Sequence, residues 1–258
     1  MTSTDLGSEL KGRRIIVTGA SSGIGAAVAK EFGAHGAHLC IHYNSNRAGA
    51  EDVVAAITAV GGKAIAIQGD LSRRGAPATL IAEAARSLGG LDLLINNAGD
   101  MLERQPLDAV GDADLDRMID LNVRPTVRAC AAAIPFVRAS RGAIINVTSV
   151  AAHSGASAGG NLYAAAKGFI STYTRGLARE LAADGIRVNG VAPGVIATPL
   201  HARRTPPAIF DKMPSLIPLG RVGTADDCVG AFLFLACASM SGYLTGQIIE
   251  VNGGQYMA

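Results

Sequence analysis

Hydrophobic residues along the chain gather in seven short runs, and longer segments of helical character lie between these runs. The runs that we expect to form strands are 14–18, 38–43, 64–68, 91–96, 142–148, 186–192 and 247–251. Several of them have apolar residues at successive positions, which is typical of parallel strands covered on both faces. The segments that we expect to form helices are about 23–35, 47–60, 76–88, 112–138, 160–184 and 225–237.

This alternation predicts an α/β protein with a single Rossmann-fold domain: a doubly wound, seven-stranded parallel sheet flanked by helices on both faces. Residues 13–258 would form the domain, and residues 1–12 an N-terminal tail. The segment 193–218 carries five prolines before Pro218, which predicts a long irregular connection. Long loops in compact domains are often lids, so we expect a substrate lid at about 196–218.

Composition and charge exclude several classes of protein. The chain has 258 residues, of which 49% are hydrophobic and 17% charged, and its formal net charge is +2. This balance predicts a large buried core, and it indicates no nucleic-acid partner. The four cysteines form no CxxC pair, so we expect no metal site and read them as free, buried thiols in a reducing, cytoplasmic compartment.

Two segments bear on membranes and targeting. The first residues lack the apolar core of a signal peptide. Residues 229–249 carry no charge and are long enough to span a bilayer, but Ser241, Gly242 and Thr245 are among the polar and small residues that interrupt them. We therefore expect a buried helix, a turn and a buried strand there, and no membrane partner.

A glycine-rich turn follows the first expected strand directly and opens a helix. Its sequence is Thr18-Gly19-Ala20-Ser21-Ser22-Gly23-Ile24-Gly25. A pyrophosphate must approach the backbone N–H groups at a helix N-terminus closely, so side chains there must be small. The spacing differs from the common GxGxxG, and such a turn also occurs without any ligand. Its place after the first strand favours a dinucleotide site.

The end of the second strand bears on the choice between NADP(H) and NAD(H). An acidic residue there would bind the adenosine ribose 2′-hydroxyl, yet no Asp or Glu occurs between Phe32 and Ala50. Tyr43, Asn44, Ser45 and Arg47 would instead supply hydrogen-bond donors and a positive charge to a 2′-phosphate. We expect a preference for NADP(H); NAD(H) remains the alternative, because Arg47 can equally begin a solvated helix.

Tyr163 and Lys167 are the candidate acid–base pair. At positions i and i+4 of one expected helix they share a face. A free tyrosine titrates near pH ~10, and a neighbouring ammonium favours the phenolate, so we expect Lys167 to lower the pKa of Tyr163. A YxxxK pattern is also an ordinary helix-face pair, so the neighbours decide its meaning.

Two further residues add to this pair. Ser149 ends the fifth strand, at the sheet edge where doubly wound proteins bind ligands, and its hydroxyl would donate to a developing alkoxide. Asn122 lies just before Pro125, which has no N–H to donate, so we expect an irregular helix there that holds a water. The structural alternatives are that Ser149 is only a helix cap or turn residue, and that Asn122 only marks a helix kink.

At this point the motifs resemble those of the short-chain dehydrogenase/reductase superfamily, closest to its 3-oxoacyl-ACP reductase and glucose 1-dehydrogenase-like group. The resemblance covers about 11–257. The motifs occur in the family's order and are specific as a set: TGASSGIG at 18–25, GDLS at 69–72, NNAG at 96–99, LNV at 121–123, INVTS at 145–149, YAAAK at 163–167, RVNGVAPG at 187–194 and GQIIEVNGG at 246–254.

The resemblance implies a carbonyl–alcohol oxidoreductase that transfers hydride. Tyr163 would be the general acid or base, Ser149 would polarise the substrate carbonyl, Lys167 would also bind the nicotinamide ribose, and Asn122 would anchor a water of a proton relay. It further implies that Asp70 contacts the adenine. The full set expected at the cofactor is Gly19, Ser21, Ser22, Gly23, Ile24, Gly25, Tyr43, Asn44, Ser45, Arg47, Asp70, Leu71, Asn96, Asn97, Ala98, Gly99, Tyr163, Lys167, Pro193, Gly194, Ile196 and Thr198.

The substrate itself is not readable from the sequence; a 3-oxoacyl thioester, a small ketone and a sugar-like alcohol all fit. We expect Ser149, Tyr163 and His153 to contact it, with a solvated loop histidine as the alternative for His153. The resemblance also implies a homotetramer. Two other functions stay open: a non-catalytic dinucleotide sensor, and a non-redox enzyme such as an epimerase or lyase.

Overall fold

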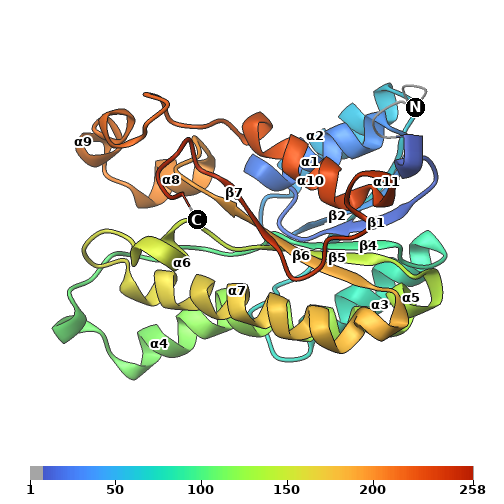
Figure 1. Ribbon diagram of the computed structural model, residues 1–258, viewed down its shortest axis with the longest axis horizontal. Coiled ribbons are helices and arrows are strands. Elements are labelled where there is room, and N and C mark those ends of the chain that lie inside the picture. Colours follow the sequence, from blue (N-terminus) through green and yellow to red (C-terminus); the bar gives the residue numbers. More distant parts are fainter. Residues whose placement is uncertain (1–7, 258) are drawn as a thin grey trace.

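One parallel sheet organises the protein. The computed structural model describes residues 8–257, and within them seven strands pair in the order β3-β2-β1-β4-β5-β6-β7 (Figure 1). The strands are β1 (Arg14–Val17), β2 (His38–Tyr43), β3 (Lys63–Gln68), β4 (Leu93–Asn96), β5 (Ala143–Val147), β6 (Arg187–Pro193) and β7 (Ile248–Val251). Each lies within two residues of its expected limits. The predicted doubly wound sheet is confirmed.

Helices cover both faces of this sheet in two layers (Figure 1). One layer contains α1 (Gly23–Ala34), α2 (Arg47–Ala59), α10 (Ala225–Ala236) and α11 (Ala238–Ser241). The other contains α3 (Ala76–Leu88), α4 (Asp112–Met118), η3 (Ile119–Val123), α5 (Arg124–Ser140), α7 (Asn161–Leu181) and η4 (Ala182–Asp184). Five of the six expected helices are present with bounds within three residues of those expected, and the sixth, 112–138, is interrupted.

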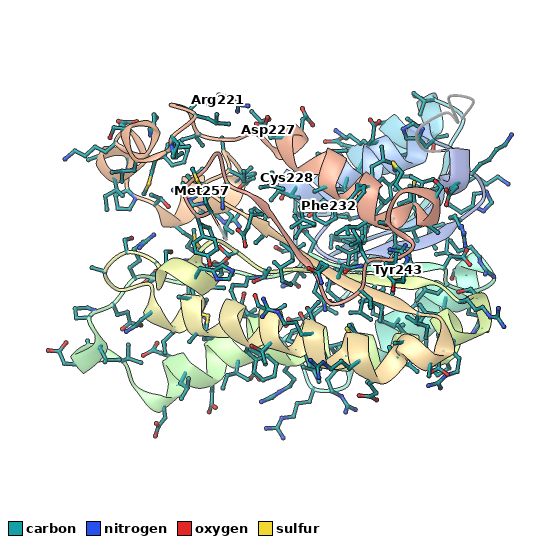
Figure 2. All side chains as sticks on the ribbon, viewed as in Figure 1. Arg221, Asp227, Cys228, Phe232, Tyr243 and Met257 are labelled. Carbon is teal, nitrogen blue, oxygen red and sulfur yellow. The ribbon has the colours of Figure 1, made fainter. Side chains whose placement is uncertain are left out.

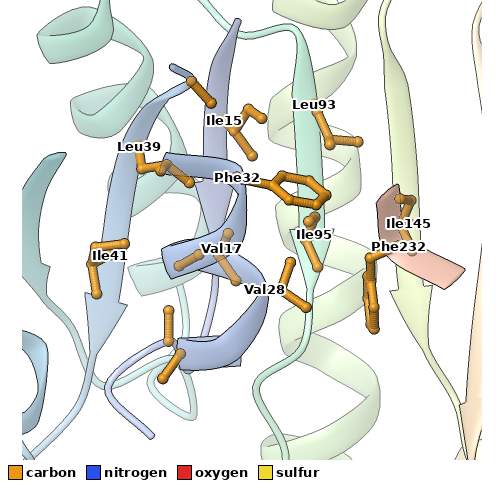
Figure 3. Close-up of a cluster of buried hydrophobic side chains, with 14 of the residues drawn as sticks. Ile15, Val17, Val28, Phe32, Leu39, Ile41, Leu93, Ile95, Ile145 and Phe232 are labelled. Carbon is orange, nitrogen blue, oxygen red and sulfur yellow. The ribbon is translucent and has the colours of Figure 1, made fainter. Parts of the chain in front are cut away.

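The strand sequences explain why both layers are needed. Successive side chains of a strand point to opposite faces. In β1, Ile15 and Val17 join the cluster beneath α1 and α10, whereas Ile16 joins the cluster beneath α3, α5 and α7. Figure 3 shows Phe32 and Val28 of α1 packed over the first of these faces. A sheet that is apolar on both sides must be buried on both sides, as the continuous apolar runs predict.

The expected helix 112–138 is not continuous. It is divided into α4, a π-helical turn η3, and α5, and Asn122 lies in η3. The break falls where expected, because Pro125 cannot donate a hydrogen bond to the carbonyl of Leu121.

The segment after β6 has more regular structure than the irregular connection that the sequence predicts. It contains α8 (Pro199–Arg204), α9 (Pro207–Phe210) and η5 (Met213–Leu216), and these stand beside the short α6 (Ala151–Ser154) at one end of the molecule (Figure 1). Prolines at the first turns of these helices fit there, because the first N–H groups of a helix need no partner within it. We call residues 196–218 the lid.

An ion pair fixes the chain where it leaves the lid. Arg221 contacts both carboxylate oxygens of Asp227 at 2.7 Å, and Asp227 also accepts from the Thr224 N–H at the start of α10 (Figure 2). The pair thus holds the chain just after the lid against the start of α10.

The N-terminal boundary differs from the expectation in part. Residues 1–7 of the expected tail lie outside the described residues. Residues 8–10 form the 3-10 helix η1 (Ser8–Leu10), in which Leu10 is buried in the core and Glu9 accepts from the N–H groups of Ala238 and Ser239. These residues therefore belong to the folded domain. Within 8–257, no helix is both long and apolar enough to cross a bilayer.

Candidate active site

The carboxyl ends of β1 and β4 mark the point where the strand order changes direction, and the glycine-rich turn lies there. Gly19 has a φ of +63°, and a Cβ on it would lie 2.9 Å from the Cα of Ala98. A Cβ on Gly25 would lie 2.7 Å from the carbonyl oxygen of Gly19. Only glycine fits these two places, so the turn lies directly against the loop after β4. This is the edge where doubly wound sheets bind ligands.

A cavity of about 570 Å³ runs along this edge. Thirteen of the residues expected at the cofactor line it: Gly19, Ser21, Ser22, Gly23, Ile24, Asn44, Ser45, Asp70, Leu71, Asn97, Ala98, Gly99 and Thr198. A narrow glycine cradle at a helix start, with a polar far end at Asn44 and Asp70, fits a dinucleotide. We call this space the nucleotide cavity.

Three expected cofactor residues have other roles in the structure. Tyr43 is buried in the core, because the odd positions of β2 face α1 and α2. The guanidinium of Arg47 contacts Glu51 at 2.7 Å on the exposed side of α2. Asn96 is buried and donates to the side chain of Asn146 within the sheet. None of the three lines the nucleotide cavity.

His42 is a residue of this cavity that the sequence analysis missed. Its Nδ1 accepts from the N–H of Gly19 at 3.0 Å, and its Nε2 lies 2.9 Å from the carbonyl of Gly69. Burial lowers the pKa of His42 more than the hydrogen bond to Gly69 raises it. The neutral imidazole thus joins the glycine-rich turn to the end of β3. The only sequence signal for a special role of His42 is its position as a polar residue inside the apolar run of β2.

A second cavity, of about 300 Å³, holds the catalytic candidates Ser149, Tyr163 and Lys167. Pro193, Gly194 and Ile196, expected near the nicotinamide, line it too. The two cavities share the walls formed by Ile24, Asn97, Gly99, Thr198 and Leu200. We call this space the substrate cavity. The shared walls place the two cavities side by side, as a transfer between a nucleotide and a second molecule requires.

The pKa of Tyr163 is raised, not lowered as we expected. Burial raises it to about 12, against the lowering effect of a hydrogen bond with Ser149. Lys167 Nζ lies 5.7 Å from the centre of the Tyr163 ring and donates to the carbonyl of Val147 at 2.9 Å. Burial lowers the pKa of Lys167 to about 8. For Tyr163, the desolvation that disfavours the phenolate therefore outweighs the hydrogen bond with Ser149 that favours it.

Asn122 is in the expected place but is engaged by protein. Its Oδ1 accepts from the N–H of Asp100 at 3.1 Å, and its Nδ2 donates to the carbonyl of Asp100 at 2.9 Å. Its Nδ2 also lies 3.2 Å from the carbonyl of Met118. The side chain is 1% exposed and lines neither cavity. This geometry makes Asn122 a brace for the loop after β4, and its expected role as a water anchor stays a prediction.

His153 has no place in the substrate cavity. Its Nε2 lies 3.2 Å from a carboxylate oxygen of Glu250, and its ring stacks on Tyr256 at 4.2 Å between centres. The short helix α6, which Gly155 ends with a φ of +75°, directs it toward β7. The expected contact of His153 with substrate is therefore wrong for this geometry.

Several side chains of the lid line the two cavities, although none of the sequence motifs includes them. Leu200 lines both cavities, Arg203 lines the nucleotide cavity, and His201 lines the substrate cavity. Nε and Nη2 of Arg204 donate to the two carboxylate oxygens of Asp100, the residue after the NNAG motif, at 2.8 and 3.0 Å. The sequence offers no pattern that pairs residues so far apart.

A doubly wound sheet with a glycine cradle, and a Ser–Tyr–Lys group in the cavity beside it, is the arrangement of an NAD(P)-dependent oxidoreductase. A family model described as enoyl-(acyl carrier protein) reductase matches residues 19–255. The chain belongs to this family of short-chain dehydrogenases/reductases, as the motifs indicated.

Curated relatives and solved structures agree with this assignment. The chain is 37% identical to 3beta-hydroxysteroid dehydrogenase 1 of Eggerthella lenta, covering 95% of this chain and 94% of the relative. It is 37% identical to a 3-oxoacyl-[acyl-carrier-protein] reductase of Synechocystis, covering 94% and 96%. A short-chain dehydrogenase from Burkholderia cenocepacia in complex with NADP superposes with a TM-score of 0.89, at 36% identity and 95% and 98% coverage. An NADH-dependent reductase complexed with NAD superposes with a TM-score of 0.88, at 34% identity and 98% and 100% coverage.

Proposed function

We propose that this enzyme interconverts a carbonyl and a secondary alcohol, with NADP(H) as the preferred cofactor and Tyr163 as the proton donor or acceptor. The observation that supports it best is the position of Tyr163, in a cavity that also contains Ser149 and Lys167 and shares a wall with the nucleotide cavity. A proton and a hydride must both reach one carbonyl group, and these side chains surround the space where they would meet.

Each side chain has a definite task in this proposal. The bound nicotinamide supplies or accepts the hydride. Tyr163, with a pKa of about 12, holds its proton at neutral pH and donates it to the substrate oxygen during reduction. Ser149 donates a hydrogen bond to the same oxygen as negative charge develops there. Lys167, with a pKa of about 8, supplies positive charge close to the ring of Tyr163.

The preference for NADP(H) is supported by the far end of the nucleotide cavity. Asn44 and Ser45 line it at the end of β2 and carry no negative charge. Arg203, from the lid, adds a positive charge to the same cavity. The structural relatives include both an NADP and an NAD complex, so NAD(H) is the alternative.

Replacing Tyr163 by phenylalanine tests the proposal. In Tyr163→Phe, turnover of carbonyl substrates with NADPH should fall by at least about 100-fold, in line with the loss of a general acid. Nucleotide affinity, measured by fluorescence titration, should stay near wild type. Tyr173→Phe on the same helix α7 is the control, because Tyr173 lines neither cavity.

Two results would contradict the proposal. Full activity in Tyr163→Phe would remove the assigned proton donor. A wild-type enzyme that binds NADPH tightly yet reduces no carbonyl compound would favour the sensor or the non-redox enzyme.

We also propose a homotetramer. Its support is the set of large apolar side chains left exposed on the helical and C-terminal surfaces, such as Phe169, exposed to 47%, and the fully exposed Tyr243. Light scattering coupled to size-exclusion chromatography measures the mass directly. A monomer at micromolar concentration would refute it.

A further inference from the structure

One cation of the substrate cavity has no task in the proposed reaction. Arg104 follows β4 in the chain and lines this cavity together with Ser149, Tyr163 and Lys167. Its side chain is half-buried. No motif of the family-like set includes Arg104, and the proposed proton transfer does not use it.

The charge of Arg104 has no carboxylate partner among residues 8–257. Its Nη1 contacts the hydroxyl of Ser157 and lies 3.5 Å from the carbonyls of Ser157 and Ala158. It takes part in none of the ion pairs between described residues, and no Asp or Glu lines the substrate cavity. Asp100, whose charge contributes to the raised pKa of Tyr163, forms its ion pair with Arg204.

The loop before the catalytic helix holds Arg104 in place. The N–H of Gln105 donates to the carbonyl of Gly159 at 3.4 Å. A Cβ on Gly159, whose φ is +75°, would lie 2.9 Å from the nitrogen of Gln105, and one on Gly160 would lie 3.4 Å from Nη1 of Arg104. The absence of a side chain at Gly159 thus lets the chain at Arg104 and Gln105 lie against this loop, with the guanidinium at van der Waals distance from Gly160.

Arg104 also acts on a lid residue that lines the same cavity. Burial, and after it the charge of Arg104, lowers the pKa of His201. His201 therefore lines the cavity as a neutral ring at neutral pH and adds no charge of its own. The rest of the wall is mainly apolar, with Met101, Met213 and Leu216 among its residues.

We propose that Arg104 makes the cavity selective for carbonyl substrates that carry a carboxylate on a short apolar body; this rests on the proposed function. An uncompensated guanidinium in a partly dry cavity favours an anion, and its planar fork matches a carboxylate with two parallel hydrogen bonds. The carbonyl of such a substrate lies at Tyr163 and its carboxylate at Arg104.

Paired probes separate charge from shape. The probes are 4-oxopentanoate, 5-oxohexanoate and 6-oxoheptanoate, each compared with its methyl ester, at saturating NADPH. For the chain length that fits best, wild-type kcat/KM for the acid should exceed that for the ester by at least about tenfold. In Arg104→Met the value for the acid should fall about 10- to 100-fold, mainly through KM, while the value for the ester stays within about twofold. Arg104→Lys should retain part of the preference.

Arg86→Met is the matched control, because Arg86 lies on the exposed last turn of α3 and its loss removes the same charge elsewhere. It should change neither value. Equal use of acid and ester by the wild type, with Tyr163-dependent turnover, would overturn this inference and leave the proposed function intact. Equal losses for acid and ester in Arg104→Met would assign Arg104 a structural role only. Absence of turnover with every acid, ester and neutral ketone would overturn the proposed function as well.

Discussion

Arg204 on the lid binds both carboxylate oxygens of Asp100, so that one ion pair joins the lid to the loop after β4. Burial raises the pKa of Asp100, but hydrogen bonds from Arg204 and from the N–H of Leu102 outweigh this and lower it. The carboxylate thus stays charged at neutral pH. The pair fixes α8, which carries residues of both cavities.

We expect Arg204→Gln to weaken nucleotide binding. Removing a part-buried ion pair costs on the order of 1 kcal/mol, and the lid would lose the contact that holds Leu200 and Arg203 over the nucleotide cavity. The Kd for NADPH should rise about three- to tenfold, as measured by fluorescence titration. Arg138→Gln is the control: it removes an ion pair in which Nε and Nη2 of Arg138 donate to Asp184, away from both cavities, and it should leave the Kd unchanged. Equal Kd values in the two variants would show that the lid is held in another way.

The pKa values of the catalytic pair predict opposite pH profiles for the two reaction directions. Reduction needs the protonated Tyr163 and the charged Lys167, so kcat/KM should be level below about pH 8 and fall above it as Lys167 loses its proton. Oxidation needs the Tyr163 phenolate, and its rate should rise with pH without a plateau below pH ~10. Lys167→Arg, which keeps the charge, should extend the level part of the reduction profile. An oxidation plateau beginning near pH ~7 would contradict the raised pKa of Tyr163.

Cofactor preference should depend on Asn44 and not on Arg47. In Asn44→Asp, a carboxylate would face the nucleotide cavity, repel a 2′-phosphate and accept from a ribose hydroxyl. The ratio of kcat/KM for NADPH over NADH should fall by at least about tenfold. Arg47→Gln should leave this ratio within about twofold, because Glu51 already binds the guanidinium. A large change of this ratio in Arg47→Gln would show that Arg47 does contact the 2′-phosphate.

The sequence was sufficient for the sheet and for most of the site because both depend on local patterns. Apolar runs placed β1 to β7, and glycine spacing placed the turn at Gly19. The parallel order then brings Ser149 and Gly99 to one sheet edge, since strand ends of a doubly wound sheet share that edge.

The rest depends on contacts that no local pattern encodes. The interpretation of Tyr163 was wrong in sign, because it counted the ammonium of Lys167 and omitted the desolvation that the packed helix imposes. His153 and Tyr43 were misplaced since the direction of a side chain follows from the packing of its whole element. The pair of Asp100 and Arg204 joins residues about a hundred positions apart, and only the folded lid brings them together.

His42 should make the stability of the protein depend on pH. The neutral ring accepts from Gly19 and donates to Gly69, whereas a protonated ring would turn a second N–H toward the N–H of Gly19. Burial holds the pKa of His42 below its ordinary value of about 6.5. Between the pKa of His42 in the folded protein and its ordinary value, the unfolded chain binds more protons than the folded one. The free energy of unfolding therefore decreases as pH falls below ~6.5, by at most about 1.4 kcal/mol per pH unit.

A glutamine at this position keeps a donor and an acceptor but has no charge to gain. Urea unfolding at pH 7.5 and 5.5 should therefore show a larger loss for the wild type than for His42→Gln. Equal losses would mean that His42 titrates alike in the folded and unfolded chain, and that its bond to the glycine-rich turn does not depend on the neutral ring.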